Sequence, residues 1–170
     1  YCLCASNTPD DETSITVAGK GFVHQVSIAD GTSSLEYQNA SLWFYDSCTD
    51  IVTDTVFLVG RNDYADDISS IIVMKIDSDD DYRPILVFES KTTPGVKKYG
   101  EKIAVHGNTI MIVVSTTGAA AGRRIIAYNT ITAGPVTIVA EGNFPLLTAS
   151  KSNTAQFYYS DSSNLYYYNT

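Results

Sequence analysis

Apolar residues occur in short runs that are separated by polar turns along most of the chain. The clearest pair of runs is 110–114 and 123–128, on either side of a turn rich in glycine and alanine. Two further pairs have the same arrangement: 55–59 with 70–74, and 155–159 with 165–168. Runs of this length beside turn residues are typical of β-hairpins.

The runs are rich in β-branched and aromatic residues, and no 3.6-residue periodicity persists beyond a few positions. Both features favour strands over helices, so we predict an all-β fold. The expected strands are 15–17, 22–28, 35–37, 42–45, 55–59, 70–76, 85–88, 103–105, 110–114, 125–128, 136–139, 146–147, 157–159 and 165–168.

Several of these runs are continuously apolar instead of alternating with polar residues. Residues 71–74 and 110–114 are examples. A strand of this kind is covered on both faces, as it is when sheets stack face to face. The runs also recur with a loose period of about 45 residues. We therefore predict antiparallel sheets built from repeated strand-pair units, with 42–45 closing the first unit.

Three segments carry a family resemblance. Residues 107–114 (GNTIMIVV) are followed by 124–129 (RIIAYN), and residues 164–169 read NLYYYN. These segments resemble the inner strands of β-propeller blades of the kelch and quinoprotein type, over most of 51–170. The resemblance implies a propeller-like fold. It implies no particular activity, because propellers serve many functions.

The pattern divides the chain into an extended, polar N-terminal arm at 1–14 and a single all-β domain at 15–170. The last unit lacks an outer strand, which residues 14–18 could supply in the same molecule or in a neighbour. A β-sandwich, a jelly roll and a pilin-like fold remain alternatives to the propeller.

Composition excludes some partners. The chain has 170 residues and a formal net charge of −8, which disfavours binding to nucleic acid. No apolar run approaches the ~20 residues of a membrane helix, so we expect no membrane span.

Three features favour a secreted, extracellular protein: a start at Tyr1 that suggests processing, a glycosylation sequon at Asn39, and three cysteines. We expect Cys48 to form a disulfide with either Cys2 or Cys4, because one intervening residue strains a Cys2–Cys4 bridge. The remaining cysteine could link a neighbouring subunit, form a mixed disulfide with a small thiol or stay reduced. In a cytosolic protein all three cysteines would be thiols. Zinc is disfavoured because the usual CxxC and HxxxH spacings are absent.

Asp77, Asp79 and Asp81 have the 1, 3, 5 spacing of a calcium loop. The match ends there, because Tyr82 stands where the loop needs glycine and Phe88 where it needs glutamate. A loop containing Asp63, Asp66 and Asp67 could share the ion. The alternative is an acidic hairpin tip that keeps an edge soluble. Calcium is thus the one possible cofactor.

The sequence contains no familiar catalytic motif. His24 and His106 are its only histidines, and both lie in apolar runs, which favours structural roles. The chain also lacks the GxSxG, HExxH and P-loop patterns. We therefore expect no catalytic residues and no enzymatic activity.

Tyrosine is the most distinctive residue type, with 12 copies in the chain. Neighbouring tyrosines on a strand point to opposite faces, so part of this set faces outward or contacts a partner. Ordinary strand tyrosines are the alternative. The candidate interaction surface consists of Tyr158, Tyr159, Tyr166, Tyr167 and Tyr168.

Together these observations favour a non-enzymatic, secreted structural protein that associates with itself as a subunit of a filament, coat or similar assembly. The alternative is a propeller-like module that binds carbohydrate or protein, with or without calcium.

Overall fold

A computed structural model describes residues 4–7, 14–65, 68–76, 84–92, 95–118, 121–132, 136–152 and 154–170. Over these ranges the chain forms strands and turns and no helix, which confirms the predicted all-β fold. Accordingly, none of the described residues belongs to a helix long and apolar enough to cross a membrane. The strands are β1 (Cys4–Asn7), β2 (Ser14–Ala18), β3 (Lys20–Ser27), β4 (Ser33–Asp50), β5 (Thr55–Ala65), β6 (Ile68–Ile76), β7 (Ile85–Lys91), β8 (Val96–His106), β9 (Thr109–Gly118), β10 (Gly122–Asn129), β11 (Thr137–Glu141), β12 (Leu146–Ala149), β13 (Gln156–Ser160) and β14 (Leu165–Asn169).

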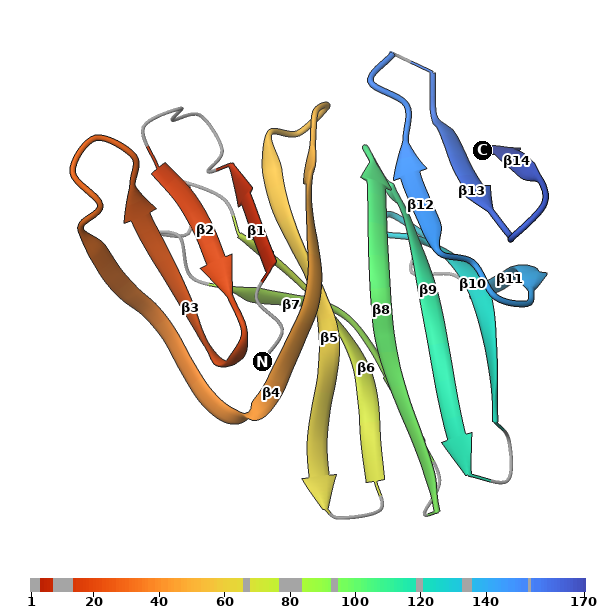
Figure 1. Ribbon diagram of the computed structural model, residues 1–170, viewed down its shortest axis with the longest axis horizontal. Helices are drawn as coiled ribbons and strands as arrows, with labels where there is room; N and C mark the ends of the chain where they lie inside the picture. The colour runs from red at the N-terminus through yellow and green to blue at the C-terminus, as the bar shows by residue number, and fades with distance from the viewer. Residues whose placement is uncertain are drawn as a thin grey trace.

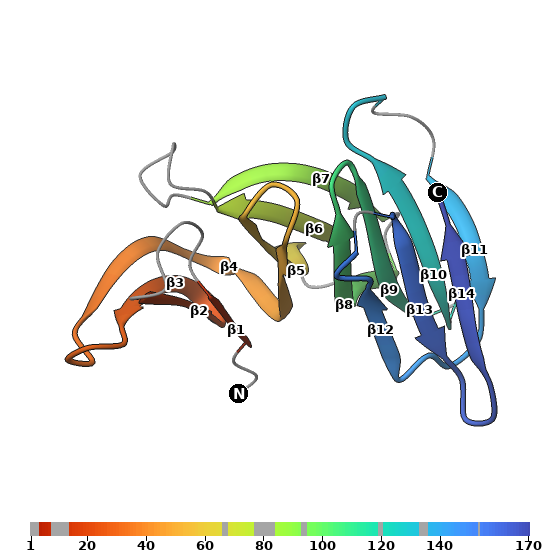
Figure 2. The ribbon, with the colours of Figure 1, turned by 90° about the horizontal axis from the view of Figure 1, so that it is seen from above.

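The strands are arranged as a fan (Figures 1 and 2). Strands β1 to β11 are hydrogen-bonded into one strongly bent sheet, and β12 to β14 form a second sheet. We divide the fan into sheet 1 (β1, β2, β3 and residues 33–38 of β4), sheet 2 (residues 42–50 of β4 with β5, β6 and β7), sheet 3 (β8 to β11) and sheet 4 (β12 to β14). Strands within each sheet are antiparallel, and a single parallel bridge between β6 and β8 connects sheets 2 and 3.

The long strand β4 belongs to two sheets. Its residues 33–38 and Trp43 pair with β3, and residues 42–50 pair with β5. The register is irregular in both pairings. Gly60 of β5 accommodates this irregularity, because a Cβ at Gly60 would lie 1.8 Å from the carbonyl oxygen of Trp43. The prediction that residues 42–45 close the first unit was therefore wrong in large part: Trp43 pairs with β3, but 42–45 begin the innermost strand of sheet 2.

Sheets stack against one another through strands that are apolar on both faces, as predicted. In β5, Val56 and Leu58 pack toward sheet 1, whereas Phe57 and Val59 pack toward sheet 3. In β9, the alternating residues face sheet 2 on one side and sheet 4 on the other. Three hydrophobic clusters of the described residues thus fill the spaces between sheets 1 and 2, 2 and 3, and 3 and 4.

The N-terminal segments lie in sheet 1. Residues 4–7 of the expected arm form β1, which pairs with β2, and β2 also pairs with β3. Because β2 is paired along both edges, it has no edge left to complete sheet 4 in this molecule. The suggestion that residues 14–18 add the missing outer strand of the last unit was therefore wrong for this molecule.

We predict that the stability of the fan depends on the side chains between sheets. Ile112, which is fully buried between sheets 2 and 3, should lose about 2–5 kcal/mol of unfolding free energy on substitution by alanine, measured by urea denaturation. Ile131 is 73% exposed, so Ile131→Ala should change the unfolding free energy by less than about 0.5 kcal/mol. Equal losses in the two variants would contradict the role of sheet stacking.

Candidate functional site

The innermost strands of the fan form a groove. Strands β4, β8 and β12 run side by side near its centre (Figure 1). Between them lies an open groove of about 320 Å³, and its lining includes Asp46, Cys48, Lys102, Ser150 and Lys151. The groove is therefore largely polar and carries both charge signs.

Asp46 is the carboxylate at the wall of this groove. Burial raises the pKa of Asp46, and three groups oppose that shift: the backbone N–H groups of Ile103 and Ser47, and the charge of Lys102. The Ile103 N–H donates to Asp46 Oδ2 at 3.0 Å, which ties β4 to β8. Asp46 thus holds a partly desolvated charge and positions two inner strands.

Cys48 also lines the groove, but its environment does not activate the thiol. Burial raises the pKa of Cys48 far above its usual range, and the nearby charges of Asp46 and Asp50 raise it further. Since the thiolate is the reactive form of cysteine, a thiol that stays protonated at neutral pH is a poor nucleophile.

Cys4 and Cys48 are both free thiols, so the Cys4–Cys48 alternative of the expected disulfide is not formed. The two residues lie on opposite faces of sheet 2: Cys4 packs between sheets 1 and 2, and Cys48 packs between sheets 2 and 3. A bridge between Cys4 and Cys48 is excluded because the sheet separates them. Cys2 lies outside the described residues.

Asp50 and His106 fix the turns at one end of the groove. Asp50 is fully buried, and its carboxylate accepts hydrogen bonds from the backbone N–H groups of Val52, Thr53 and Gly107. His106 is buried, and its Nε2 donates to the carbonyl oxygen of Ser152 at 2.7 Å. Both side chains therefore connect neighbouring sheets.

The other histidine, His24, lies in sheet 1, away from the groove between β4, β8 and β12. His24 is half-buried in sheet 1, where its ring meets Phe22 edge to face, with centroids 5.3 Å apart. The structure thus does not bring His24 and His106 together.

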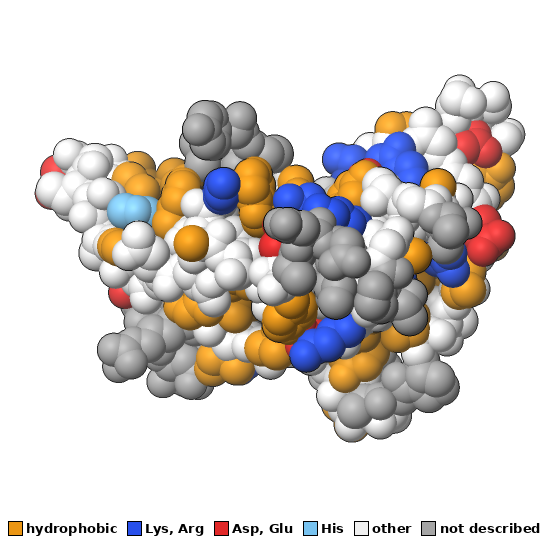
Figure 3. Space-filling view, turned by 90° about the horizontal axis from the view of Figure 1, so that it is seen from below, with side chains coloured by type: hydrophobic (Ala, Val, Ile, Leu, Met, Phe, Trp, Pro, Cys, Tyr) orange, Lys and Arg blue, Asp and Glu red, His pale blue; other side chains and the backbone are white. Residues whose placement is uncertain are grey.

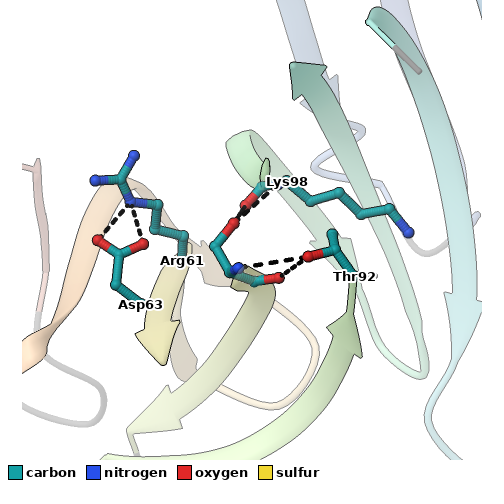
Figure 4. A network of polar contacts seen from close by, with 5 residues as sticks. Arg61, Asp63, Thr92 and Lys98 are labelled. Atoms are coloured by element: carbon teal, nitrogen blue, oxygen red, sulfur yellow. Dashed lines mark hydrogen bonds and ion pairs between the residues drawn. The ribbon is translucent and has the colours of Figure 1, made fainter. Parts of the chain in front are cut away.

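Asp77, Asp79 and Asp81 lie outside the described residues, as do Asp66 and Asp67. Asp63 forms an ion pair with Arg61 of the same strand at 3.0 Å (Figure 4). Within the described ranges, no group of three or more His, Cys, Asp or Glu residues is placed to hold a metal ion. The calcium site remains a prediction.

A second polar network in Figure 4 holds sheets 2 and 3 together. The hydroxyl of the buried Ser69 donates to the carbonyl oxygen of Lys98 and accepts from its N–H, both at 2.9 Å. The hydroxyl of Thr92 donates to the carbonyl oxygen of Ser69 at 2.8 Å. These contacts are structural.

Asn39 lies at the irregular part of β4 and is half-buried. Its Oδ1 accepts from the N–H of Ser41 at 3.0 Å, and its Nδ2 donates to the hydroxyl of Tyr37 at 3.5 Å. Glycosylation of Asn39 remains a prediction.

The five candidate tyrosines all lie in sheet 4, but on two different faces. The pairs Tyr159–Tyr166 and Phe157–Tyr168 lie on the face toward sheet 3, since Phe157 and Tyr159 are buried there. Tyr158 pairs with Tyr167 on the opposite face, and Tyr167 is 69% exposed. The five tyrosines that were predicted to form one interaction surface therefore lie on two opposite surfaces of sheet 4.

The face toward sheet 3 ends in a cleft of about 460 Å³. It lies between the β11–β12 connection and the β13–β14 turn, and its lining includes Asn143, Phe144, Tyr159, Asp161 and Tyr166. Of these residues, the sequence identified only Tyr159 and Tyr166 as candidates for an interaction surface. The others stand in turns, where residue type alone does not separate a site from a loop.

No protein-family model matches the sequence, and no curated protein is similar enough to count as a relative. Solved structures are similar in fold. Hydrazine synthase of Kuenenia stuttgartiensis superposes with a TM-score of 0.62 at 11% identity, over 92% of this chain and 43% of that one. A glucose dehydrogenase superposes with a TM-score of 0.60 at 14% identity, over 92% of this chain and 56% of that one.

The fold is propeller-like. The chain spans about half the length of these two solved chains. At such low identity the similarity concerns the fold alone. The blade type, kelch or quinoprotein, remains a prediction.

We predict that ionisation of the Asp46 carboxylate lowers the free energy of unfolding as the pH rises above the acidic range. A raised pKa in the folded state means that folding costs free energy once the pH exceeds the ordinary value of 3.8. Asp46→Asn keeps an acceptor for the Ile103 N–H, so its unfolding free energy should rise relative to the unchanged protein between about pH 3 and about pH 7.

Asp161 provides the control with the opposite sign. Hydrogen bonds from the Ser163 N–H, the Tyr166 hydroxyl and the Asn164 N–H lower the pKa of Asp161 to about 2. Its contribution to stability is present above its ordinary pKa of 3.8 and is lost as the pH falls through about 2. The Asp161→Asn variant should therefore lose stability relative to the unchanged protein as pH rises through this window. Parallel pH profiles for the two variants, measured by denaturation, would refute the assignment.

Proposed function

We propose that the chain is a non-enzymatic structural subunit that acts outside the cell by associating with copies of itself. One observation carries the proposal: each terminal sheet of the fan presents a face with exposed hydrophobic side chains that no other described part of the chain covers. The inner faces of sheets 1 and 4 pack on sheets 2 and 3, so their outer faces remain open.

The open face of sheet 1 follows from strand alternation. Thr16, Ala18 and Val23 are buried toward sheet 2, so the alternate residues point away. These are half-buried apart from Leu35, which is 50% exposed. Hydrophobic side chains also reach the surface over this N-terminal part when the molecule is seen from below, at the left of Figure 3. The open face consists of Ile15, Val17, Phe22, His24, Val26 and Leu35.

The open face of sheet 4 carries Leu146, Thr148, Tyr158, Leu165 and Tyr167, together with the polar Gln156, Ser160 and Asn169. Leu165 is 67% exposed and lies on β14, an edge strand of this sheet. None of these side chains is charged. An exposed edge beside an uncharged face favours the docking of another sheet.

A second copy is the occupant that best matches the two faces. The interactions that already join the four sheets are contacts of the same kind, between apolar sheet faces. The two similar solved chains are about twice as long as this one, so two copies supply about as much sheet as one of them. Sheet 4 of one copy on sheet 1 of the next is a head-to-tail contact, which forms a ring if it closes and a filament if it does not.

The non-enzymatic part of the proposal is supported by the groove. Its thiol is protonated at neutral pH, and the one histidine beside it is bound to a backbone carbonyl. Neither group is poised for nucleophilic or acid–base chemistry.

We predict that a charge on the open face of sheet 4 prevents association. Sedimentation velocity should show the mass of the unchanged protein rising with concentration. Tyr167→Arg should weaken association by at least about tenfold, because the contact would bury an unpaired charge. Thermal melting should confirm that the variant folds.

Ile131→Arg is the matched control, since Ile131 is exposed in the connection after β10 and belongs to neither open face. It should associate like the unchanged protein. A monomer at every concentration, or equal association of both arginine variants, would contradict the proposal.

A further inference from the structure

The cleft beside sheet 4 has an aromatic wall held in a fixed geometry. The rings of Tyr159 and Tyr166 stack with centroids 5.3 Å apart and planes 19° apart. Phe144 meets Tyr159 edge to face at 5.5 Å. Phe144 and Tyr159 are buried, whereas Tyr166 is 38% exposed. One face of Tyr166 is thus packed on protein, and the ring remains partly accessible from the cleft.

A hydrogen bond fixes the orientation of Tyr166. Its hydroxyl donates to Asp161 Oδ2 at 2.8 Å, and Asp161 is itself held by the N–H groups of Ser163 and Asn164 at 2.7 and 2.8 Å. The ring is therefore ordered before any ligand arrives. A preorganised ring buries area on binding at a low cost in conformational entropy.

The rim of the cleft offers hydrogen-bond donors and acceptors beside this ring. Asp161 supplies carboxylate oxygens, and Ser162 supplies a hydroxyl. The Oδ1 of Asn143 accepts from Arg123, which leaves the amide nitrogen of Asn143 as a donor. Hydroxyl groups of a ligand need both kinds of partner.

The charges around the cleft disfavour anionic ligands. The Asp161 carboxylate lines the cleft, and Arg123, whose partner Asn143 also lines the cleft, is paired with Glu101. Anionic ligands such as uronates and phosphates meet like charge there. The volume of about 460 Å³ lies in the range of small-molecule sites, roughly 300–1,000 Å³.

We propose that this cleft binds a neutral saccharide, with one pyranose ring packed against Tyr166 and its hydroxyl groups hydrogen-bonded to Asp161, Ser162 and Asn143. The site goes beyond self-association. Tyr166 lies on the inner face of sheet 4, whereas the proposed subunit contact uses the outer face and Tyr167.

The proposal is tested with defined probes. Cellotetraose, chitotetraose, a β-1,4-galactan oligosaccharide and mannotriose are titrated at millimolar concentration, with a polygalacturonate tetrasaccharide as the anionic probe. Saturation-transfer NMR detects contact, and calorimetry gives Kd. We expect at least one neutral saccharide to bind and the anionic probe not to bind.

Variants then locate the site. Tyr166→Ala removes the stacking ring and should weaken binding by about tenfold or more. Tyr166→Phe keeps the ring and should retain binding within about threefold. Tyr167→Ala, on the opposite face of the same strand, is the matched control and should bind like the unchanged protein. Thermal melting checks that each variant is folded.

Three results would overturn the saccharide site: no binding of any neutral probe, preferential binding of the anionic probe, or undiminished binding by Tyr166→Ala. Equal weakening by Tyr166→Ala and Tyr167→Ala would also overturn it, because it would place the ligand on the outer face. Failure of self-association leaves these outcomes unchanged, so the two proposals are separable.

Discussion

The structure depends on the burial of strands from both sides at once. In β5 and β9 every other side chain packs toward one neighbouring sheet and the remaining ones toward the other. Apolar surface removed from water is the dominant favourable term in folding. Each sheet is therefore stable chiefly as part of a stack, and the fan is held together by contacts between sheet faces.

Two consequences follow from stacking. The strands near the centre of the fan bring Asp46 of β4 and Lys102 of β8 to one groove, although 56 positions separate them in the sequence (102 − 46). The sheets at the two ends of the fan each keep one face without a neighbour among the described residues. The groove and the open faces thus arise from the same arrangement, and the open faces are where the proposed association would take place.

The sequence contained enough information to predict the strands and their stacking. The run at 110–114 is apolar at five successive positions, and a strand of that kind requires cover on both faces. The sequence did not reveal that β4 is shared by sheets 1 and 2, because residues 33–50 contain neither glycine nor proline to mark the bend. The glycine that permits the bend, Gly60, lies on the partner strand.

The candidate sites were only partly predictable. Successive side chains of a strand alternate between its faces, so Tyr166 and Tyr167 were expected on opposite faces. The sequence did not show which of the two faces sheet 3, because the residues around both are similar. The cleft also needs Phe144 and Asp161, which stand in turns that only the folded chain brings together. The Cys4–Cys48 alternative of the disulfide prediction failed for a related reason, since spacing does not show on which side of a sheet a cysteine lies.

The central claim is that the open faces of sheets 1 and 4 bind each other between copies. Hydrogen exchange measured on dilute and concentrated protein tests it most directly. The account predicts that backbone amides in β2, β3 and the 33–38 segment, together with those in β13 and β14, gain protection with concentration, while β9 stays unchanged. Protection that does not change with concentration in either terminal sheet, or that rises in only one of them, would contradict it.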